Sequence, residues 1–297
     1  MTDAVPAVYE PLDERFAAVG GDSRLERLWT GGRWTEGPLY VPAGRYLLFS
    51  DIPNDRVLRW CETDGSVSVF GSPAGYANGR TLDRQGRVVT CQHGERRVVR
   101  TEHDGSTTVL ADRLDGRRFN SPNDVVVSSD GAVWFTDPPY GIASDYEGHR
   151  AEPEVDGCHV YRVDPRTGQV AAVATDLERP NGLAFSPDES RLYVADTQRR
   201  HLRVFDVDGG RLAGGDVLAD LEGGPDGVRV DDAGRVWVAA GTAVHVLHPD
   251  GTLLGRLRLP EEVSNLTFGG PKRNRLFLTA TTSVYSILLT VTGPRLV

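Results

Sequence analysis

Six polar residues open six short apolar strands that are spaced along the whole chain. They are Glu36, Asn78, Asn123, Asn181, Asp226 and Asn265. Each is a carboxylate or an amide, and they are accompanied by no thiolates and few imidazoles. Carboxylate and amide oxygens are the ligands that Ca²⁺ prefers in proteins, and Mg²⁺ and Mn²⁺ come next. If the strands converge, these residues predict a site for one hard divalent cation.

Four further residues end the strands that follow: Asp51, His93, Asp137 and Asp196. Because the second strand of an antiparallel hairpin runs back, its end lies beside the start of the first. For Asp51 and Asp196 we expect a structural role, in which the carboxylate binds backbone amides. Asp137 is followed directly by an irregular insertion at residues 138–157, which we interpret as a lid over the site.

Turn chemistry is the competing explanation for the strand-opening residues. Asn and Asp before glycine are common in turns, and Asn78, Asn181 and Asp226 each precede a glycine. Glu36 also precedes a glycine, although glutamate is a poor turn residue. Six such residues in phase favour a common site over six independent turns.

The strands that carry these residues belong to a repeat with a period of about 45 residues. From Leu25 onward, each repeat reads as four short strands with turns rich in Asp, Ser, Pro and Gly. Six repeats predict an all-β fold, a six-bladed β-propeller with four antiparallel strands per blade. A pair of β-sandwiches is the alternative, but it does not explain the repeat. We expect residues 25–297 to form one domain, and residues 1–24 to be a leader that supplies the strand missing from the sixth repeat.

Composition and charge narrow the functional classes. The chain of 297 residues has a formal net charge of −9, which argues against a nucleic-acid binder. We find no apolar segment typical of a signal peptide and no run long enough to span a bilayer. Cys61, Cys91 and Cys158 follow no metal-ligand spacing, so we expect reduced thiols. These features favour a cytoplasmic protein that acts on a small molecule, and they do not indicate its oligomeric state.

Several short stretches match, in the same order, those of one known family. They are Glu36-Gly-Pro, Ala77-Asn-Gly, Thr90-Cys-Gln-His-Gly, Phe119-Asn-Ser-Pro-Asn-Asp, Phe135-Thr-Asp-Pro-Pro-Tyr-Gly, Arg179-Pro-Asn-Gly-Leu-Ala-Phe-Ser-Pro-Asp, Tyr193-Val-Ala-Asp, Gly224-Pro-Asp-Gly-Val-Arg-Val-Asp and Asn265-Leu-Thr-Phe-Gly-Gly. On these stretches the chain resembles the gluconolactonase, senescence-marker-protein-30 and luciferin-regenerating-enzyme family, in its bacterial gluconolactonase branch. The resemblance runs from about Glu36 to the C-terminus.

This resemblance implies a six-bladed propeller with one divalent cation on its axis, usually calcium, with Mg²⁺, Mn²⁺ or Zn²⁺ as alternatives. The ligands that it implies are Glu36, Asn123, Asn181 and Asp226. Asn78 and Asn265 lie in the predicted ring without being expected ligands.

The activity that the resemblance implies is hydrolysis of a sugar lactone such as gluconolactone to the hydroxy acid. The cation would polarise the lactone carbonyl while a carboxylate deprotonates the attacking water. Asp226 is our first choice for that base, and Asp137 is the second. The residues expected to contact substrate are Asn78, His93, Asn120 and Tyr140.

Two other functions stay open. The same scaffold could hydrolyse organophosphates, with an aspartate as nucleophile, or act as an ester or epoxide hydrolase or a cyclase in a biosynthetic pathway. A non-catalytic propeller that binds a partner protein is the third possibility. The acidic mouth argues against this third possibility, because surfaces that bind partner proteins favour aromatic and basic residues.

Overall fold

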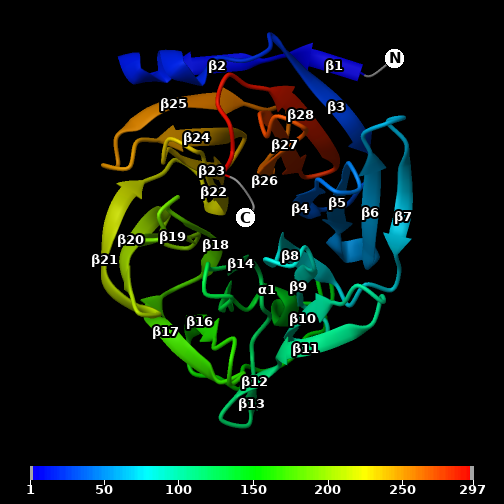
Figure 1. The fold of residues 1–297 in the computed structure, drawn as a ribbon, viewed down its shortest axis with the longest axis vertical. Coiled ribbons are helices and arrows are strands. Elements are labelled where there is room, and N and C mark those ends of the chain that lie inside the picture. Colours follow the sequence, from blue (N-terminus) through cyan, green and yellow to red (C-terminus); the bar gives the residue numbers. More distant parts are fainter. Residues whose placement is uncertain (1–2, 295–297) are drawn as a thin grey trace.

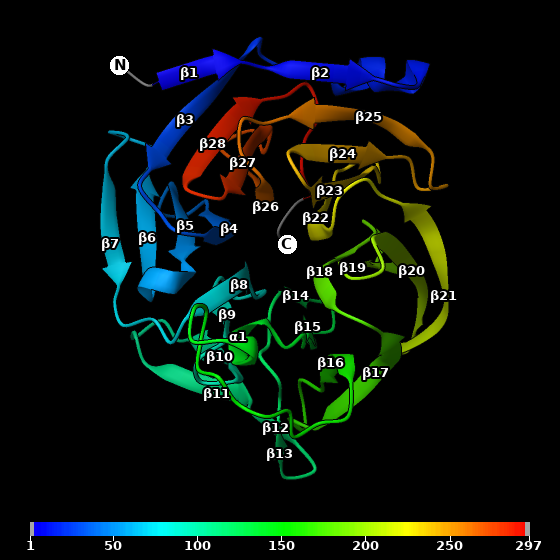
Figure 2. The same cartoon turned by 180° about the vertical axis from the view of Figure 1, so that it is seen from behind.

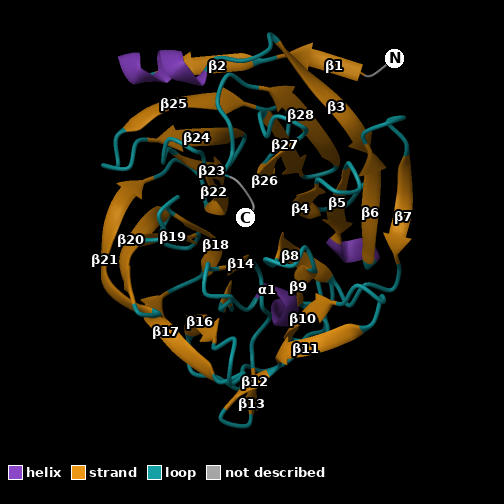
Figure 3. Ribbon diagram, viewed as in Figure 1, coloured by secondary structure: helices purple, strands orange, loops and turns teal. Residues whose placement is uncertain are grey.

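The computed structural model describes residues 3–294. Strands make up nearly all of the regular structure, and six blade sheets are arranged around a central axis (Figures 1 and 3). Each blade contains four antiparallel strands that follow one another from the axis outward. The six-bladed propeller predicted from the repeat is therefore confirmed.

The first three blades follow the predicted order of strands. Blade one contains β4 (Thr35–Val41), β5 (Tyr46–Asp51), β6 (Arg56–Cys61) and β7 (Val67–Gly71). Blade two contains β8 (Ala77–Leu82), β9 (Val88–Gln92), β10 (Arg97–Thr101) and β11 (Thr107–Ala111). Blade three contains β14 (Val125–Val127), β15 (Val133–Thr136), β16 (Cys158–Val163) and β17 (Val170–Leu177).

The last three blades complete the ring. Blade four contains β18 (Pro180–Phe185), β19 (Arg191–Asp196), β20 (His201–Asp208) and β21 (Arg211–Asp220). Blade five contains β22 (Pro225–Val230), β23 (Val236–Ala240), β24 (Ala243–Leu247) and β25 (Leu253–Arg258). Blade six contains β26 (Val263–Gly269), β27 (Arg275–Ala280), β28 (Ser283–Leu288) and, from the other end of the chain, β3 (Arg24–Thr30).

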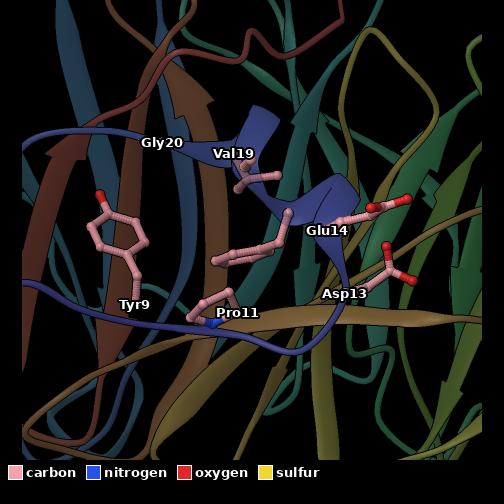
Figure 4. A pocket seen from close by; sticks show the side chains of 8 residues that line it. Tyr9, Pro11, Asp13, Glu14, Val19 and Gly20 are labelled. Carbon is pink, nitrogen blue, oxygen red and sulfur yellow. The ribbon is translucent and has the colours of Figure 1, made fainter.

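Strand β3 closes the propeller by pairing antiparallel with β28, with Ser283 opposite Thr30. The missing strand is thus supplied from near the N-terminus, but by residues 24–30 and not by residues 1–24, which the sequence predicted. The segment before it adds two outer strands, because β1 (Asp3–Pro6) pairs with β3 and β2 (Val8–Pro11) pairs with β25. A short 3₁₀ helix, η1 (Glu14–Val19), follows β2 and borders a hollow of about 360 Å³ at the outer rim (Figure 4).

Short elements outside the blades are few in residues 3–294. They are the 3₁₀ helix η2 (Ile52–Asn54), the hairpin of β12 (Arg113–Leu114) and β13 (Arg117–Arg118), and the helix α1 (Tyr140–Ala143). None of the helices in this part of the chain has the length and apolar character needed to cross a membrane.

The hydrophobic core is divided into clusters that lie between neighbouring blades. Trp237 of blade five packs with Leu276 and Leu278 of blade six, and Trp134 of blade three packs with Leu192 of blade four. All five side chains are at most 1% exposed. Because each blade buries its faces against its neighbours, the axis itself is left for polar side chains.

The innermost strands of the six blades, β4, β8, β14, β18, β22 and β26, surround that axis (Figures 1 and 2). They run in the same direction, so their starting ends meet at one mouth of the central channel. The ends of the second strands return to this mouth, as the antiparallel pairing of Thr35 with Asp51 and of Pro180 with Asp196 shows. The fold therefore places the predicted polar residues at one end of the molecule.

Candidate active site

The structure brings the strand-opening residues together in a buried ring. Asn78 Nδ2 donates to Asn123 Oδ1 at 2.8 Å, and Asn123 Nδ2 donates to Asn181 Oδ1 at 2.6 Å. Across the seam between blades six and one, Asn265 Nδ2 donates to Glu36 Oε2 at 3.0 Å. These five side chains are at most 5% exposed, whereas Asp226 is half-buried.

The glycines that follow four ring residues are explained by close packing between blades. A Cβ atom on Gly37 would clash with the backbone of Asn78, and one on Gly227 would clash with Asn265. Gly79 and Gly182 face the next ring residue in the same way. These glycines are therefore required for the close approach of neighbouring blades at the ring, and tight turns alone do not explain them.

The two ring carboxylates lie in an environment that disfavours negative charge. Burial, together with the charge of Asp124, raises the pKa of Glu36 to about 8. Burial raises the pKa of Asp226 well above its usual range, and the charges of Glu36 and Glu147 add to this effect. Among residues 3–294, the Asp226 carboxylate has no hydrogen-bonding or basic partner.

His93 is also buried in the ring, and burial lowers its pKa to about 4. It is therefore neutral near pH 7. Its Nδ1 lies 3.2 Å from the carbonyl oxygen of Glu147, and its Nε2 lies 3.1 Å from Asn123 Oδ1 and 3.3 Å from Asn78 Nδ2. Both oxygens can only accept, so the neutral imidazole donates to one of them. His93 thus links the ring to the insertion at residues 138–157.

Asp137 makes the contacts of a structural residue. Its two carboxylate oxygens accept the backbone N–H groups of Asn120 and Ser121, each at 2.8 Å, and burial raises its pKa to about 7. The Asn120 side chain donates to the carbonyls of Asp137 and Gly157. Within residues 3–294, no hydrogen bond joins either side chain to the six ring residues.

Asp51 and Asp196 bind backbone in the same way, as expected. Asp51 accepts the N–H of Arg33 at 2.9 Å, and Asp196 accepts those of Glu178 and Arg179 at 2.8 and 3.0 Å. Asp137 makes the same kind of contacts as these two structural residues. Its role as the second-choice base, like that of Asp226 as the first, stays a prediction.

The insertion at residues 138–157 packs over the ring. Helix α1 lies beside β9 (Figure 1). The two segments pack so closely that a side chain on Gly141 would clash with His93, the residue that follows β9. Tyr140 opens this helix, and its buried hydroxyl has no hydrogen-bond partner among residues 3–294. Asn181 and Thr197 lie close enough to that hydroxyl to affect its pKa, which burial raises to about 12.

Three features of the site were not predicted from the sequence. Glu147 of the insertion adds a half-buried carboxylate near Asp226. Thr197 receives a hydrogen bond from Asn181 and passes one to the carbonyl of Pro225, so it couples β18 to β22. The only signals were an acidic residue in a lid and a hydroxyl after a strand, and both are too common to single out a site.

A third unpredicted feature is a layer of charge beneath the ring. Arg229 Nη1 lies 3.2 Å from a carboxylate oxygen of the buried Asp124, which directly follows Asn123. Arg80 is 2% exposed and donates to the carbonyl of Gly37 and the hydroxyl of Ser50, both at 2.6 Å. These groups lie between the ring and the other end of the channel.

The predicted metal ligands fit a hard cation in their chemistry. The carboxylates of the buried Glu36 and the half-buried Asp226 have no basic partner at ion-pair distance among residues 3–294. The amide oxygen of Asn181 accepts one hydrogen bond and keeps a second lone pair, whereas that of Asn123 accepts from Asn78 and also lies 3.1 Å from His93 Nε2. In this described part of the chain, no three His, Cys, Asp or Glu side chains gather as for a metal ion, so the amides would have to complete the set.

Comparison with known proteins identifies the family. The profile described as the SMP-30/gluconolactonase/LRE-like region matches residues 34–282. The chain belongs to this family. It is 33% identical to a gluconolactonase of Zymomonas mobilis over 283 residues, covering 86% of this chain and 78% of that protein. It is 31% identical to a pentonolactonase of Haloferax volcanii, covering 84% of this chain and 82% of the other.

A solved structure of a family member is similar over the whole propeller. The gluconolactonase of Xanthomonas campestris superimposes with a TM-score of 0.91 at 40% identity, covering 97% of each chain. The family membership inferred from the short stretches is therefore confirmed, and the site described above lies in a propeller shared with this relative.

Proposed function

We propose that the protein is a divalent-metal-dependent lactonase that hydrolyses a sugar lactone to the corresponding hydroxy acid. Relatives that are named gluconolactonase and pentonolactonase support the reaction class. The observation that carries the proposal is the pair of ring carboxylates Glu36 and Asp226 at the mouth of the channel, where the charge of Glu36 adds to the burial that raises the pKa of Asp226.

A divalent cation is the counter-charge that such a pair needs. Ionising two neighbouring carboxylates that are shielded from water is unfavourable, and a cation that binds between them makes the ionised form of both favourable. Glu36, Asn123, Asn181 and Asp226 would hold the ion, and the all-oxygen donor set favours Ca²⁺ over softer metals. Bound there, the ion would supply Lewis-acid polarisation of the lactone carbonyl.

The residues of the chain account for the other requirements of lactone hydrolysis. Asp226 is the one ring carboxylate that is half-open to the mouth and without a partner, so it can take a proton from water. Neutral His93 lies within hydrogen-bonding distance of the Glu147 carbonyl in the lid and of the Asn78 and Asn123 side chains, so it connects the lid to the ring. Tyr140 in the lid presents a buried hydroxyl that could bind the substrate.

The test is hydrolysis of glucono-1,5-lactone followed by pH-stat, above the spontaneous rate. The protein is treated with a chelator and assayed alone, then with added Ca²⁺, Mn²⁺, Mg²⁺ or Zn²⁺. We expect turnover that depends on the ion and is lost in Asp226→Asn. An enzyme that binds these ions but leaves sugar lactones untouched would move the search to phosphorus esters. A chain that binds none of them would contradict the metal-dependent reading.

A further inference from the structure

Several polar groups at the mouth have no partner in the protein. Among residues 3–294, the Tyr140 hydroxyl and Asn78 Oδ1 are buried without a hydrogen bond, and the carboxylates of Asp226 and Glu147 have no hydrogen-bonding partner. Buried polar groups in a native protein are nearly always satisfied, so the two buried atoms indicate a ligand at the mouth, and the two half-buried carboxylates can accept hydrogen bonds from the same ligand. The cation proposed above would satisfy Asp226, but it leaves the groups of the lid unexplained.

Glu147 is held over the ring by the backbone of the lid. Its own carbonyl oxygen faces His93 Nδ1 at 3.2 Å. The next residue, Gly148, packs so closely on Gly141 that a side chain there would clash, and His149 N donates to the Gly141 carbonyl at 3.0 Å. The segment is therefore folded back on itself and fixes where the Glu147 side chain begins.

The Glu147 side chain lies within electrostatic range of the ring. Its charge contributes to raising the pKa of Asp226, and burial raises its own pKa to about 7. No basic side chain of residues 3–294 forms a salt bridge with it. The half-buried carboxylate can therefore accept hydrogen bonds from a ligand at the mouth.

The other acids of the insertion have structural or solvent-exposed positions. Asp145 accepts the backbone N–H of Arg150 at 2.9 Å. Glu154 accepts the N–H of Arg118 at 2.9 Å and pairs with Arg96 at 3.3 Å. Glu152 and Asp156 are exposed. Glu147 is thus the acid of the lid whose charge acts on Asp226, and within residues 3–294 its carboxylate has no hydrogen-bonding or ion-pair partner.

We propose that Glu147 is a specificity-determining residue whose carboxylate accepts hydrogen bonds from the ring hydroxyl groups of a polyhydroxylated lactone. This inference rests on the proposed lactonase function. A carboxylate is an acceptor with two oxygens, and neighbouring hydroxyls of a sugar lactone match it as donors. A lactone without hydroxyl groups would leave the carboxylate unsatisfied and gain nothing from it.

The experiment compares two substrates that share the reacting group. Wild type, Glu147→Ala and Glu147→Gln are assayed by pH-stat with glucono-1,5-lactone and with δ-valerolactone, which has the same six-membered ring without hydroxyls. Glu152→Gln is the matched control, because it removes an exposed acid of the same segment. Circular dichroism and Ca²⁺ titration calorimetry are recorded for every variant.

We expect kcat/KM for glucono-1,5-lactone to fall about 10- to 100-fold in Glu147→Ala, mainly through KM, as for loss of hydrogen bonds to a charged group. The value for δ-valerolactone should stay within about threefold, and Glu147→Gln should keep part of the preference because its amide oxygen still accepts. The control variant and the affinity for Ca²⁺ should not change.

Other outcomes would overturn the assignment. An equal fall in kcat for both lactones would make Glu147 part of the reaction step, and a fall in Ca²⁺ affinity would make it a metal ligand. An unchanged ratio of the two substrates would show that it does not contact the hydroxyl groups. If wild type hydrolyses neither lactone, the proposed function itself fails, and that result is distinct from all of these.

Discussion

The two ends of the central channel are built from the same six strands but differ in charge and in how that charge is satisfied. At the starting ends lie Glu36 and Asp226, with Glu147 above them. At the finishing ends lies a cavity of about 700 Å³, larger than the hollow at the outer rim, with apolar walls and five arginines. These arginines are Arg45, Arg80, Arg84, Arg229 and Arg273.

Most of the arginines at the far end have a partner. Salt bridges join Arg45 to Glu62 at 3.0 Å, Arg84 to Glu189 at 3.4 Å, Arg229 to Asp124 at 3.2 Å, and Arg273 to Asp232 at 3.2 Å. Arg80 binds a carbonyl and a hydroxyl instead. The cavity at the far end therefore has charges that the fold already satisfies, whereas the mouth has charges that it does not. Groups without a partner, and not the presence of a cavity, locate the candidate site.

Asp226→Asn should give the largest effect, and it should separate activity from stability. We expect the lactonase rate in the presence of metal to fall about 1,000-fold, because a ligand and base is lost. The metal-free variant should be more stable than wild type, because the half-buried carboxylate lacks a partner and is repelled by Glu36. Initial rates by pH-stat and urea unfolding with chelator measure the two effects. A metal-free variant less stable than wild type would show that Asp226 is satisfied after all.

Asp137→Asn should give the opposite result, although both aspartates end or open strands at the same mouth. The carboxylate holds two backbone N–H groups, so its loss should cost about 2–4 kcal/mol in the free energy of unfolding. The folded variant should keep kcat/KM within a few-fold. Urea unfolding and assays at a temperature where the variant is fully folded provide the measurement. A loss of rate as large as in Asp226→Asn would restore Asp137 as a catalytic base.

Asp137 and Asp226 also show which parts of the fold and the site can be predicted from the sequence. The repeat and its turns were sufficient for the propeller, because each blade follows a local pattern of short strands. The ring was predictable because its members share one position in that pattern. The sequence could not distinguish Asp137 from Asp226, since both are acids beside the same mouth. Only the three-dimensional contacts show that one is occupied by backbone amides and the other is without a partner.

The position of Glu147 could not be predicted from the sequence at all. The insertion follows no repeat, so nothing in the sequence indicates which of its acids faces the ring. Its position depends on Gly141 and Gly148, whose close packing becomes visible only in the folded lid. The pairing of Arg229 with Asp124 is likewise a contact between blades that no local pattern predicts.

The carboxylates at the mouth should also make the stability of the metal-free protein depend on pH. The pKa of Glu36 is raised from 4.5 to about 8 on folding, so between these values the folded protein binds more protons than the unfolded chain. Stability of the metal-free protein should therefore fall as pH rises from about 4.5 to 8. Asp137 and Glu147, whose pKa values are raised to about 7, act in the same direction.

Added Ca²⁺ should oppose this fall, because a cation favours the ionised carboxylates and binds the folded state. Urea unfolding at pH 5, 6, 7 and 8, with chelator and with Ca²⁺, measures the difference. Glu36→Gln is the control, and it should reduce both the pH-dependent loss and the gain from Ca²⁺. A gain from Ca²⁺ that is independent of pH and equal in this variant would place the ion elsewhere.

The far end of the channel should show the smallest effect. Arg84 and Glu189 lie on the rim of the larger cavity and form a partly exposed pair at 3.4 Å, with side chains 35% and 27% exposed. Arg84→Gln should change the free energy of unfolding by less than about 1 kcal/mol, as for other surface pairs. It should leave kcat/KM for glucono-1,5-lactone and the affinity for Ca²⁺ unchanged, because the pair lies at the opposite ends of the strands from Glu36. If this substitution lowered the rate as strongly as Asp226→Asn, the candidate site would have to include the far cavity. The presence of ion-pair partners would then no longer distinguish that cavity from the mouth.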